Sequence, residues 1–265
     1  MSRLFGVDAF TDRPFAGNPA AVCVLPSPAD PAWMRALARE MNLSETAFLW
    51  PEGSAWRLCW FTPKTEVDLC GHATLASAHV LWRHLEHPEP RLAFETRSGR
   101  LYATREGARI GLDFPAPEPE AAAVPEELAA ALGGVRPVWS GRSEDDWIVV
   151  LENAAAVRAL EPDFARLAKL PARGVVVSAR DESGAHDIVS RFFAPALGVN
   201  EDPVTGSAHA RMARYWAAAL GKDRLRAYQA SARGGALELR LRGDRVELWG
   251  TAVTVWSGRV EAGPG

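Results

Sequence analysis

The chain has few cysteines and no long apolar run. Its three cysteines, Cys23, Cys59 and Cys70, are odd in number and lie in the first third of the 265 residues. They match neither a disulfide framework nor the paired spacing of a structural zinc site. No apolar stretch approaches the roughly 20 residues that span a membrane, and the N-terminal residues lack the pattern of a signal peptide. These absences predict a cytoplasmic protein that does not contact a membrane.

The chain also lacks a dense basic segment. Its formal net charge is −3, which argues against a partner with a phosphate backbone, so no nucleic acid is expected. The length allows one large domain or two of ordinary size. One linker-like stretch, PAPEPEAAAVP at residues 115–125, favours two. We therefore expect an N-terminal half over residues 1–117 and a C-terminal half over 118–265, with the last strand a candidate to pack back on the first half.

The stretch from Trp60 to Leu81 carries the first functional signal. It combines an apolar, strand-like segment that ends at Pro63, a polar loop, and an apolar pattern with helical spacing that begins at Cys70-Gly71-His72. Glycine lets a ligand approach the backbone closely, and the first turn of a helix offers unpaired N–H groups and a positive dipole end. This pattern predicts an anion-binding helix start beside a histidine.

A similar order of parts recurs about half a chain later. Phe193-Ala194-Pro195 precedes Thr205-Gly206-Ser207 and a second helix, as Phe61-Thr62-Pro63 precedes the first. The repeat agrees with the position of the linker, and it predicts two pseudo-equivalent α+β halves. Two such helix starts facing one cleft would suit a small carboxylate.

The remaining pattern predicts short strands and a few more helices. The expected helices cover residues 32–41, 126–132, 161–170 and 207–219, and a hairpin is expected between residues 135–140 and 147–151.

Several acid and base groups lie beside these elements. Glu45 directly precedes an apolar strand, where partial desolvation would raise its pKa; the alternative is an exposed glutamate in a turn. The others are Asp68 and His72 in the first half and Glu201 and Asp202 in the second. Proton transfer at carbon needs a positioned base, an acid and stabilisation of the enolate charge, and this set fits that requirement.

Four motifs in order resemble the PhzF family of phenazine-biosynthesis-like isomerases, which has the diaminopimelate epimerase fold. They are VDAFTDRPFAGNP at residues 7–19, NLSETAF at 42–48, WFTP with EVDLCGHAT at 60–74, and NEDPVTGSAH at 200–209. The resemblance covers nearly the whole chain.

This resemblance implies an α+β fold of two pseudo-symmetric halves, each a curled β-sheet or barrel around a central helix, and a homodimer. It implies isomerase chemistry without metal or cofactor, in which Glu45 moves a proton between carbons of a small carboxylate, a dihydro-hydroxyanthranilate in the phenazine pathway. His72 and Asp202 would assist in catalysis. The substrate would be held by Gly71, Ala73, Gly206 and Ser207.

Two other interpretations stay open. Related epimerases use a cysteine at each helix start, but here Cys70 is paired with Thr205, whose hydroxyl is too weak an acid to replace a thiol. A two-thiol mechanism is therefore excluded, whereas a one-thiol epimerase that uses Cys70 is not. The other interpretation is a non-catalytic protein that binds a small ligand in the same cleft.

Overall fold

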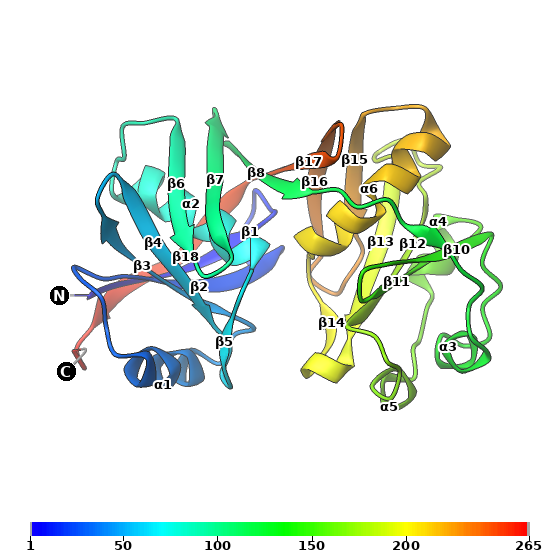
Figure 1. Ribbon diagram of the computed structural model, residues 1–265, viewed down its shortest axis with the longest axis horizontal. Helices are drawn as coiled ribbons and strands as arrows, with labels where there is room; N and C mark the ends of the chain where they lie inside the picture. Colours follow the sequence, from blue (N-terminus) through cyan, green and yellow to red (C-terminus); the bar gives the residue numbers. More distant parts are fainter. Residues whose placement is uncertain (1, 264–265) are drawn as a thin grey trace. The chain divides into compact units, whose positions relative to one another are not determined.

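A computed structural model describes residues 2–263 (Figure 1). The chain forms two compact units, one built from residues up to Asp113 together with those from Trp249 onward, the other from Phe114–Leu248. The chain leaves the first unit within β8 (Arg109–Pro115) and returns to it within β17 (Arg245–Gly250). The linker-like residues 115–125 thus lie in the second unit.

The first unit is a mixed sheet with two helices. Its other strands are β1 (Ser2–Ala9), β2 (Asn18–Val24), β3 (Thr46–Glu52), β4 (Ala55–Phe61), β5 (Glu66–Val67), β6 (Arg91–Thr96), β7 (Gly99–Glu106) and β18 (Ala252–Val260). Antiparallel pairs join β18 to β1, β1 to β2, β3 to β4 and β6 to β7, whereas β2–β3 and β4–β6 are parallel. The central helix α2 (Gly71–His84) packs against β1, β2, β3 and β18 and is buried over most of its surface.

The outer helix α1 (Pro31–Met41) covers another face of this sheet. Asp30 caps it by accepting a hydrogen bond from the Ala32 N–H, and Asn42 ends it in the left-handed conformation. Met34 and Ala38 of α1 pack into a core cluster with Phe48 and Phe61. This helix confirms the one expected over residues 32–41.

The second unit repeats this topology. Its strands are β9 (Glu120–Ala121), β10 (Trp139–Ser143), β11 (Asp146–Val150), β12 (Gly174–Arg180), β13 (Ile188–Ala194), β14 (Val199–Asp202), β15 (Arg224–Gln229) and β16 (Gly235–Arg242). Parallel pairs β11–β12 and β13–β15 alternate with antiparallel pairs, as β2–β3 and β4–β6 do in the first unit. The order of parts thus confirms the two pseudo-symmetric α+β halves.

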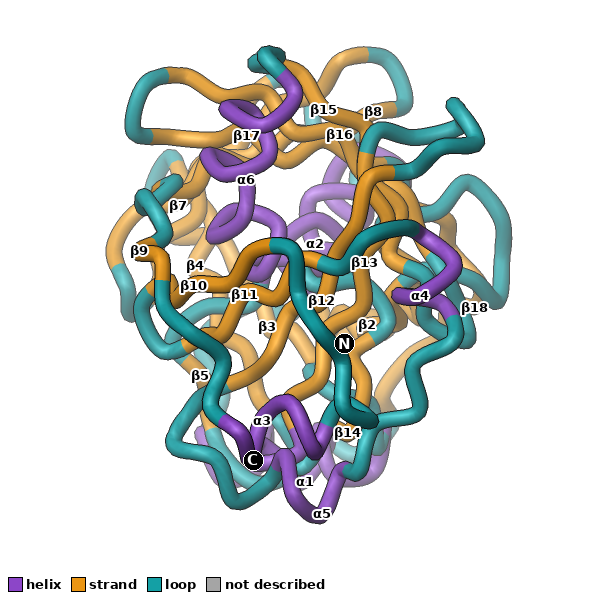
Figure 2. The backbone as a smooth tube through the Cα atoms, turned by 90° about the vertical axis from the view of Figure 1, so that its right-hand side faces the viewer, coloured by secondary structure: helices purple, strands orange, loops and turns teal. Residues whose placement is uncertain are grey.

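The central helix of the second unit is α6 (Gly206–Leu220), which lies beside β15 and β16 (Figure 2). The smaller helices are α3 (Glu126–Ala131), α4 (Ala154–Arg158), α5 (Phe164–Leu167) and the 3-10 turn Pro195–Leu197. A separate core cluster contains Leu128, Val157, Val177 and Phe193. None of the helices within residues 2–263 has both the length and the apolarity needed to cross a membrane.

One local prediction in the second half is confirmed with shifted bounds, and another is wrong. The expected hairpin is present and joins β10 to β11 through Glu144, whose φ of 52° allows a turn without glycine; its first strand begins at Trp139, four residues later than expected. The single helix expected over residues 161–170 is absent. Instead, Asp163 accepts a hydrogen bond from the Arg166 N–H and starts the one-turn α5, while α4 precedes it.

A glycine beneath a tryptophan generates a stability prediction. A Cβ atom at Gly111 would lie 2.5 Å from the Trp249 ring, which is buried, whereas one at Gly258 would meet nothing within 4 Å. We expect Gly111→Ala to lower the free energy of unfolding by about 1–3 kcal/mol, because the buried ring has no room to move. Gly258→Ala is the matched control and should change it by less than about 0.5 kcal/mol. Equal effects in urea unfolding would contradict this account.

Candidate active site

The first unit brings three chemically active side chains together at the start of α2. Glu45 directly precedes β3, Cys70 is the N-cap residue of α2, and His72 lies in its first turn. The Glu45 Oε2 atom lies 3.4 Å from His72 Nε2, and Cys70 Sγ lies 3.5 Å from His72 Nδ1. The Glu45 side chain keeps 20% of its surface exposed and that of His72 8%, so the carboxylate is the more accessible of the two.

Burial has the expected effect on Glu45. Desolvation raises its pKa above the ordinary glutamate value, and polar contacts to the side chains of Ser44 and Cys70 act in the opposite direction. The half-buried position of Glu45 therefore replaces the exposed-turn alternative. A carboxylate with a raised pKa is a better base toward carbon acids than an ordinary glutamate.

The helix start itself has no side-chain cap. Cys70 has an extended backbone and its side chain caps no N–H group, in contrast to Asp30 at the start of α1. The Thr74 hydroxyl donates to the Cys70 carbonyl oxygen at 2.6 Å, and this hydrogen bond stabilises the first turn of α2. Anion binding by the N–H groups of this turn, which include those of Gly71 and Ala73, stays a prediction.

Asp68 does not belong to this cluster of contacts. Its carboxylate is 68% exposed and accepts a hydrogen bond from Arg97 Nε at 2.5 Å, next to the Arg97–Glu66 ion pair. Arg97 thus bridges Asp68 and Glu66 in the segment before α2.

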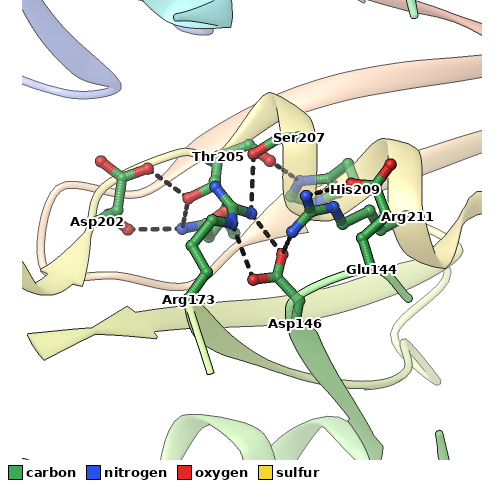
Figure 3. Close-up of polar contacts among 9 residues, drawn as sticks. Glu144, Asp146, Arg173, Asp202, Thr205, Ser207, His209 and Arg211 are labelled. Carbon is green, nitrogen blue, oxygen red and sulfur yellow. Dashed lines mark hydrogen bonds and ion pairs between the residues drawn. The ribbon is translucent and has the colours of Figure 1, made fainter. Parts of the chain in front are cut away.

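The second unit builds its helix start from hydroxyl and amide groups (Figure 3). Thr205 is the N-cap residue of α6, and its hydroxyl donates to the Asp202 carboxylate. Gln229 of β15 accepts from the Thr205 N–H at 2.8 Å and donates to the Asp202 carbonyl oxygen at 2.6 Å. Asp202 is thus held beside the first turn of α6 by two side-chain partners.

Ser207 is the second helical residue of α6 and contacts a buried ion network. Arg173 Nη2 donates to the Ser207 hydroxyl at 3.2 Å and, with Nε, binds Asp146 through both carboxylate oxygens. Asp146 is completely buried and also pairs with Arg211 (Figure 3). Arg211 also pairs with the carboxylate of Glu144, so two arginines and two carboxylates balance in charge, and Arg173 is the member of this network that contacts the α6 start.

Two other polar residues near the start of α6, Glu201 and His209, have structural partners. Glu201 forms a two-point ion pair with Arg191, at 2.7 and 2.9 Å. His209 is buried inside α6, where Nδ1 donates to the Thr205 carbonyl oxygen at 2.8 Å and Nε2 lies 3.0 Å from the Ser190 hydroxyl. Because a carbonyl oxygen only accepts, the Nδ1-protonated neutral imidazole satisfies both contacts.

Several residues of these sites were not predicted from the sequence. Arg173, Asp146 and Gln229 were not selected, although an aspartate at the head of the apolar stretch DWIVV is a signal for a buried, paired carboxylate. The contact of Glu45 with Cys70 and His72 joins segments far apart in the chain, and no local pattern reports it.

Comparison with known proteins agrees with this architecture. The PhzC-PhzF family, described as phenazine biosynthesis-like protein, matches residues 7–258. An uncharacterized isomerase of Pseudomonas aeruginosa is 55% identical over 254 residues, or 96% of each chain. One of Halalkalibacterium halodurans is 50% identical over 255 residues, or 95% of this chain and 96% of that protein. A PhzF-family phenazine biosynthesis protein of Enterococcus faecalis has a crystal structure with a TM-score of 0.94 and 43% identity, covering 98% of this chain and 99% of that one.

The chain therefore belongs to the phenazine biosynthesis-like PhzF family. The expected family and the two-halved α+β fold are both confirmed. Membership supports an isomerase-type enzyme that acts on a small molecule, since two relatives at least half identical are named isomerases.

His209 generates a pH prediction. Burial lowers its pKa to about 4, whereas an unfolded histidine titrates near 6.5. The folded state thus binds this proton less readily than the unfolded state, and stability falls as the pH drops from about 6.5 toward 4. Between pH 7 and pH 5 this residue should cost the wild type about 2 kcal/mol of unfolding free energy. In His209→Gln the loss over that interval should shrink by this amount; an unchanged loss would refute the assignment.

Proposed function

We propose that this protein is an isomerase that moves a proton between two carbons of a small carboxylate, with Glu45 as the base. The observation that carries the proposal is the position of the Glu45 carboxylate. It is half-buried, 3.4 Å from His72 Nε2, and it lies at the uncapped start of α2. Such a start can stabilise a carboxylate or an enolate oxygen through backbone N–H groups.

The residues account for each proton in the reaction. The Glu45 carboxylate removes a proton from a substrate carbon and becomes a carboxylic acid, while negative charge moves onto the conjugated oxygen of the substrate. The N–H groups at Gly71 and Ala73 stabilise that oxygen. Glu45, or the neighbouring His72 after a transfer across their 3.4 Å contact, then returns the proton to a different carbon. The enzyme ends in its starting state.

Asp202, Gly206 and Ser207 of the second unit are proposed to assist. The resemblance assigns them to catalysis and carboxylate binding, and support comes from their common position at the start of α6. Arg173, although paired with Asp146, also donates a hydrogen bond to the Ser207 hydroxyl at this helix start. A homodimer stays a prediction of the family resemblance, and a cytoplasmic location stays a prediction from the composition of the sequence.

The substrate class follows from the chemistry and the family. A base facing unpaired backbone N–H groups suits a carboxylate whose carbon acid is activated by conjugation. The family is described as phenazine biosynthesis-like, so a dihydro-hydroxyanthranilate is the first compound to test.

Replacement of Glu45 tests the base. Glu45→Gln should lower turnover of the dihydro-hydroxyanthranilate, and deuterium incorporation from solvent, by roughly two to four powers of ten, because the amide cannot accept the proton. Glu52→Gln is the matched control; this glutamate is half-exposed at the end of the same strand and should retain full activity. Full activity in Glu45→Gln would remove Glu45 from the mechanism. Tight binding of the compound without deuterium exchange in the wild type would instead indicate a binding protein.

The contact between Cys70 and His72 favours one second candidate, a one-thiol epimerase. Sγ lies 3.5 Å from Nδ1, within reach of a base that could generate the thiolate. Under the glutamate mechanism, Cys70→Ser should reduce activity by less than about tenfold, because the hydroxyl preserves the polar contact. Loss of all activity in Cys70→Ser, with Glu45→Gln active, would replace the proposal by the thiol mechanism.

A further inference from the structure

Glu45, Cys70 and His72 together form a set of metal-ligating atoms. One carboxylate oxygen, one sulfur and one imidazole nitrogen lie within 4.8 Å of one another. Zinc prefers sulfur and nitrogen ligands and accepts carboxylate oxygen, and three protein ligands with one open position are typical of accessible zinc sites. Cys70 and His72 are buried, so their donor atoms have little room to move apart.

The distances between the donor atoms approach those of a tetrahedral zinc site. Bonds of about 2.0–2.1 Å to nitrogen and oxygen place those two atoms about 3.4 Å apart, and a bond of about 2.3 Å to sulfur places sulfur about 3.5 Å from nitrogen. His72 Nε2 lies 3.4 Å from Glu45 Oε2 and 4.0 Å from Cys70 Sγ. The sulfur lies nearer Nδ1, at 3.5 Å, than Nε2, so binding through Nε2 requires the side chains of Cys70 and His72 to rotate until sulfur faces Nε2.

We propose that these three side chains bind one Zn²⁺ ion and that the bound ion switches the enzyme off. Binding converts the Cys70 thiol into a zinc-bound thiolate and releases its proton to solvent. The Glu45 carboxylate then coordinates the metal through an oxygen lone pair, and it cannot accept a proton from the substrate. The inhibitory effect rests on the proposed role of Glu45, whereas the binding itself does not.

The repeat provides an internal comparison. At the start of α6, Thr205 and Ser207 occupy the places of Cys70 and His72, and the Thr205 hydroxyl is bound to Asp202. Hydroxyl groups are poor zinc ligands beside thiolate and imidazole. We therefore expect one zinc ion per chain, held by the first unit.

Cobalt(II) is the spectroscopic probe for this site. Titration of the reduced full-length protein with Co²⁺ should produce thiolate-to-cobalt charge-transfer absorption that saturates at one equivalent, and Zn²⁺ should abolish it by displacement. Cys70→Ser should lose the band. Cys59→Ser, which removes the partly buried cysteine of β4, should keep it. His72→Gln and Glu45→Gln should weaken Zn²⁺ binding by more than the 10–100-fold typical of an outer-shell residue.

The outcomes separate the metal site from the enzymatic proposal. Absence of the band, or its persistence in Cys70→Ser, would overturn the metal site even if Glu45→Gln is inactive. One equivalent of Zn²⁺ should abolish deuterium incorporation into the dihydro-hydroxyanthranilate, and a chelator should restore it. Saturated zinc binding that both Cys70→Ser and Glu45→Gln weaken, without loss of activity, would keep the site but overturn the switch, and Glu45 would then not be the base.

Discussion

The register between β3 and β4 is the constraint on which the first site depends. Thr46, the first residue of β3, pairs with Phe61, the last residue of β4, so Glu45 and the segment that leads to α2 emerge at the same end of the sheet. The segment that follows Phe61 is short: it contains the two-residue strand β5 and ends at the N-cap residue Cys70. A slip of one residue would turn Glu45 to the opposite face of the strand and break its contact with His72.

The second unit applies the same constraint with different chemistry. Val175 of β12 pairs with Phe193 of β13, and Arg173 precedes β12 much as Glu45 precedes β3. Each of these two residues contacts the second residue of the central helix, His72 in α2 and Ser207 in α6. The duplicated scaffold therefore places a carboxylate beside the second residue of one central helix and a guanidinium, paired with Asp146, beside the second residue of the other.

The same divergence distinguishes this chain from a two-thiol epimerase. The N-cap positions are Cys70 and Thr205, and the Thr205 hydroxyl is engaged by Asp202 and Gln229. An alcohol bound in this way organises the helix start, whereas the thiol at Cys70 contacts the side chains of Glu45 and His72. The two helix starts thus share a backbone geometry but carry different side-chain chemistry.

The sequence by itself determined the family, the duplicated α+β order and the two central helices, because these depend on local periodicity, glycine positions and short motifs. It also selected Glu45 and His72, but as separate residues. The tertiary structure decided that they meet, that Cys70 joins them, and that Asp68 is held in an exposed ion pair with Arg97. It also decided the network of Arg173, Asp146 and Ser207. These contacts depend on strand register and on burial, which join distant segments, and a local pattern contains no information about either.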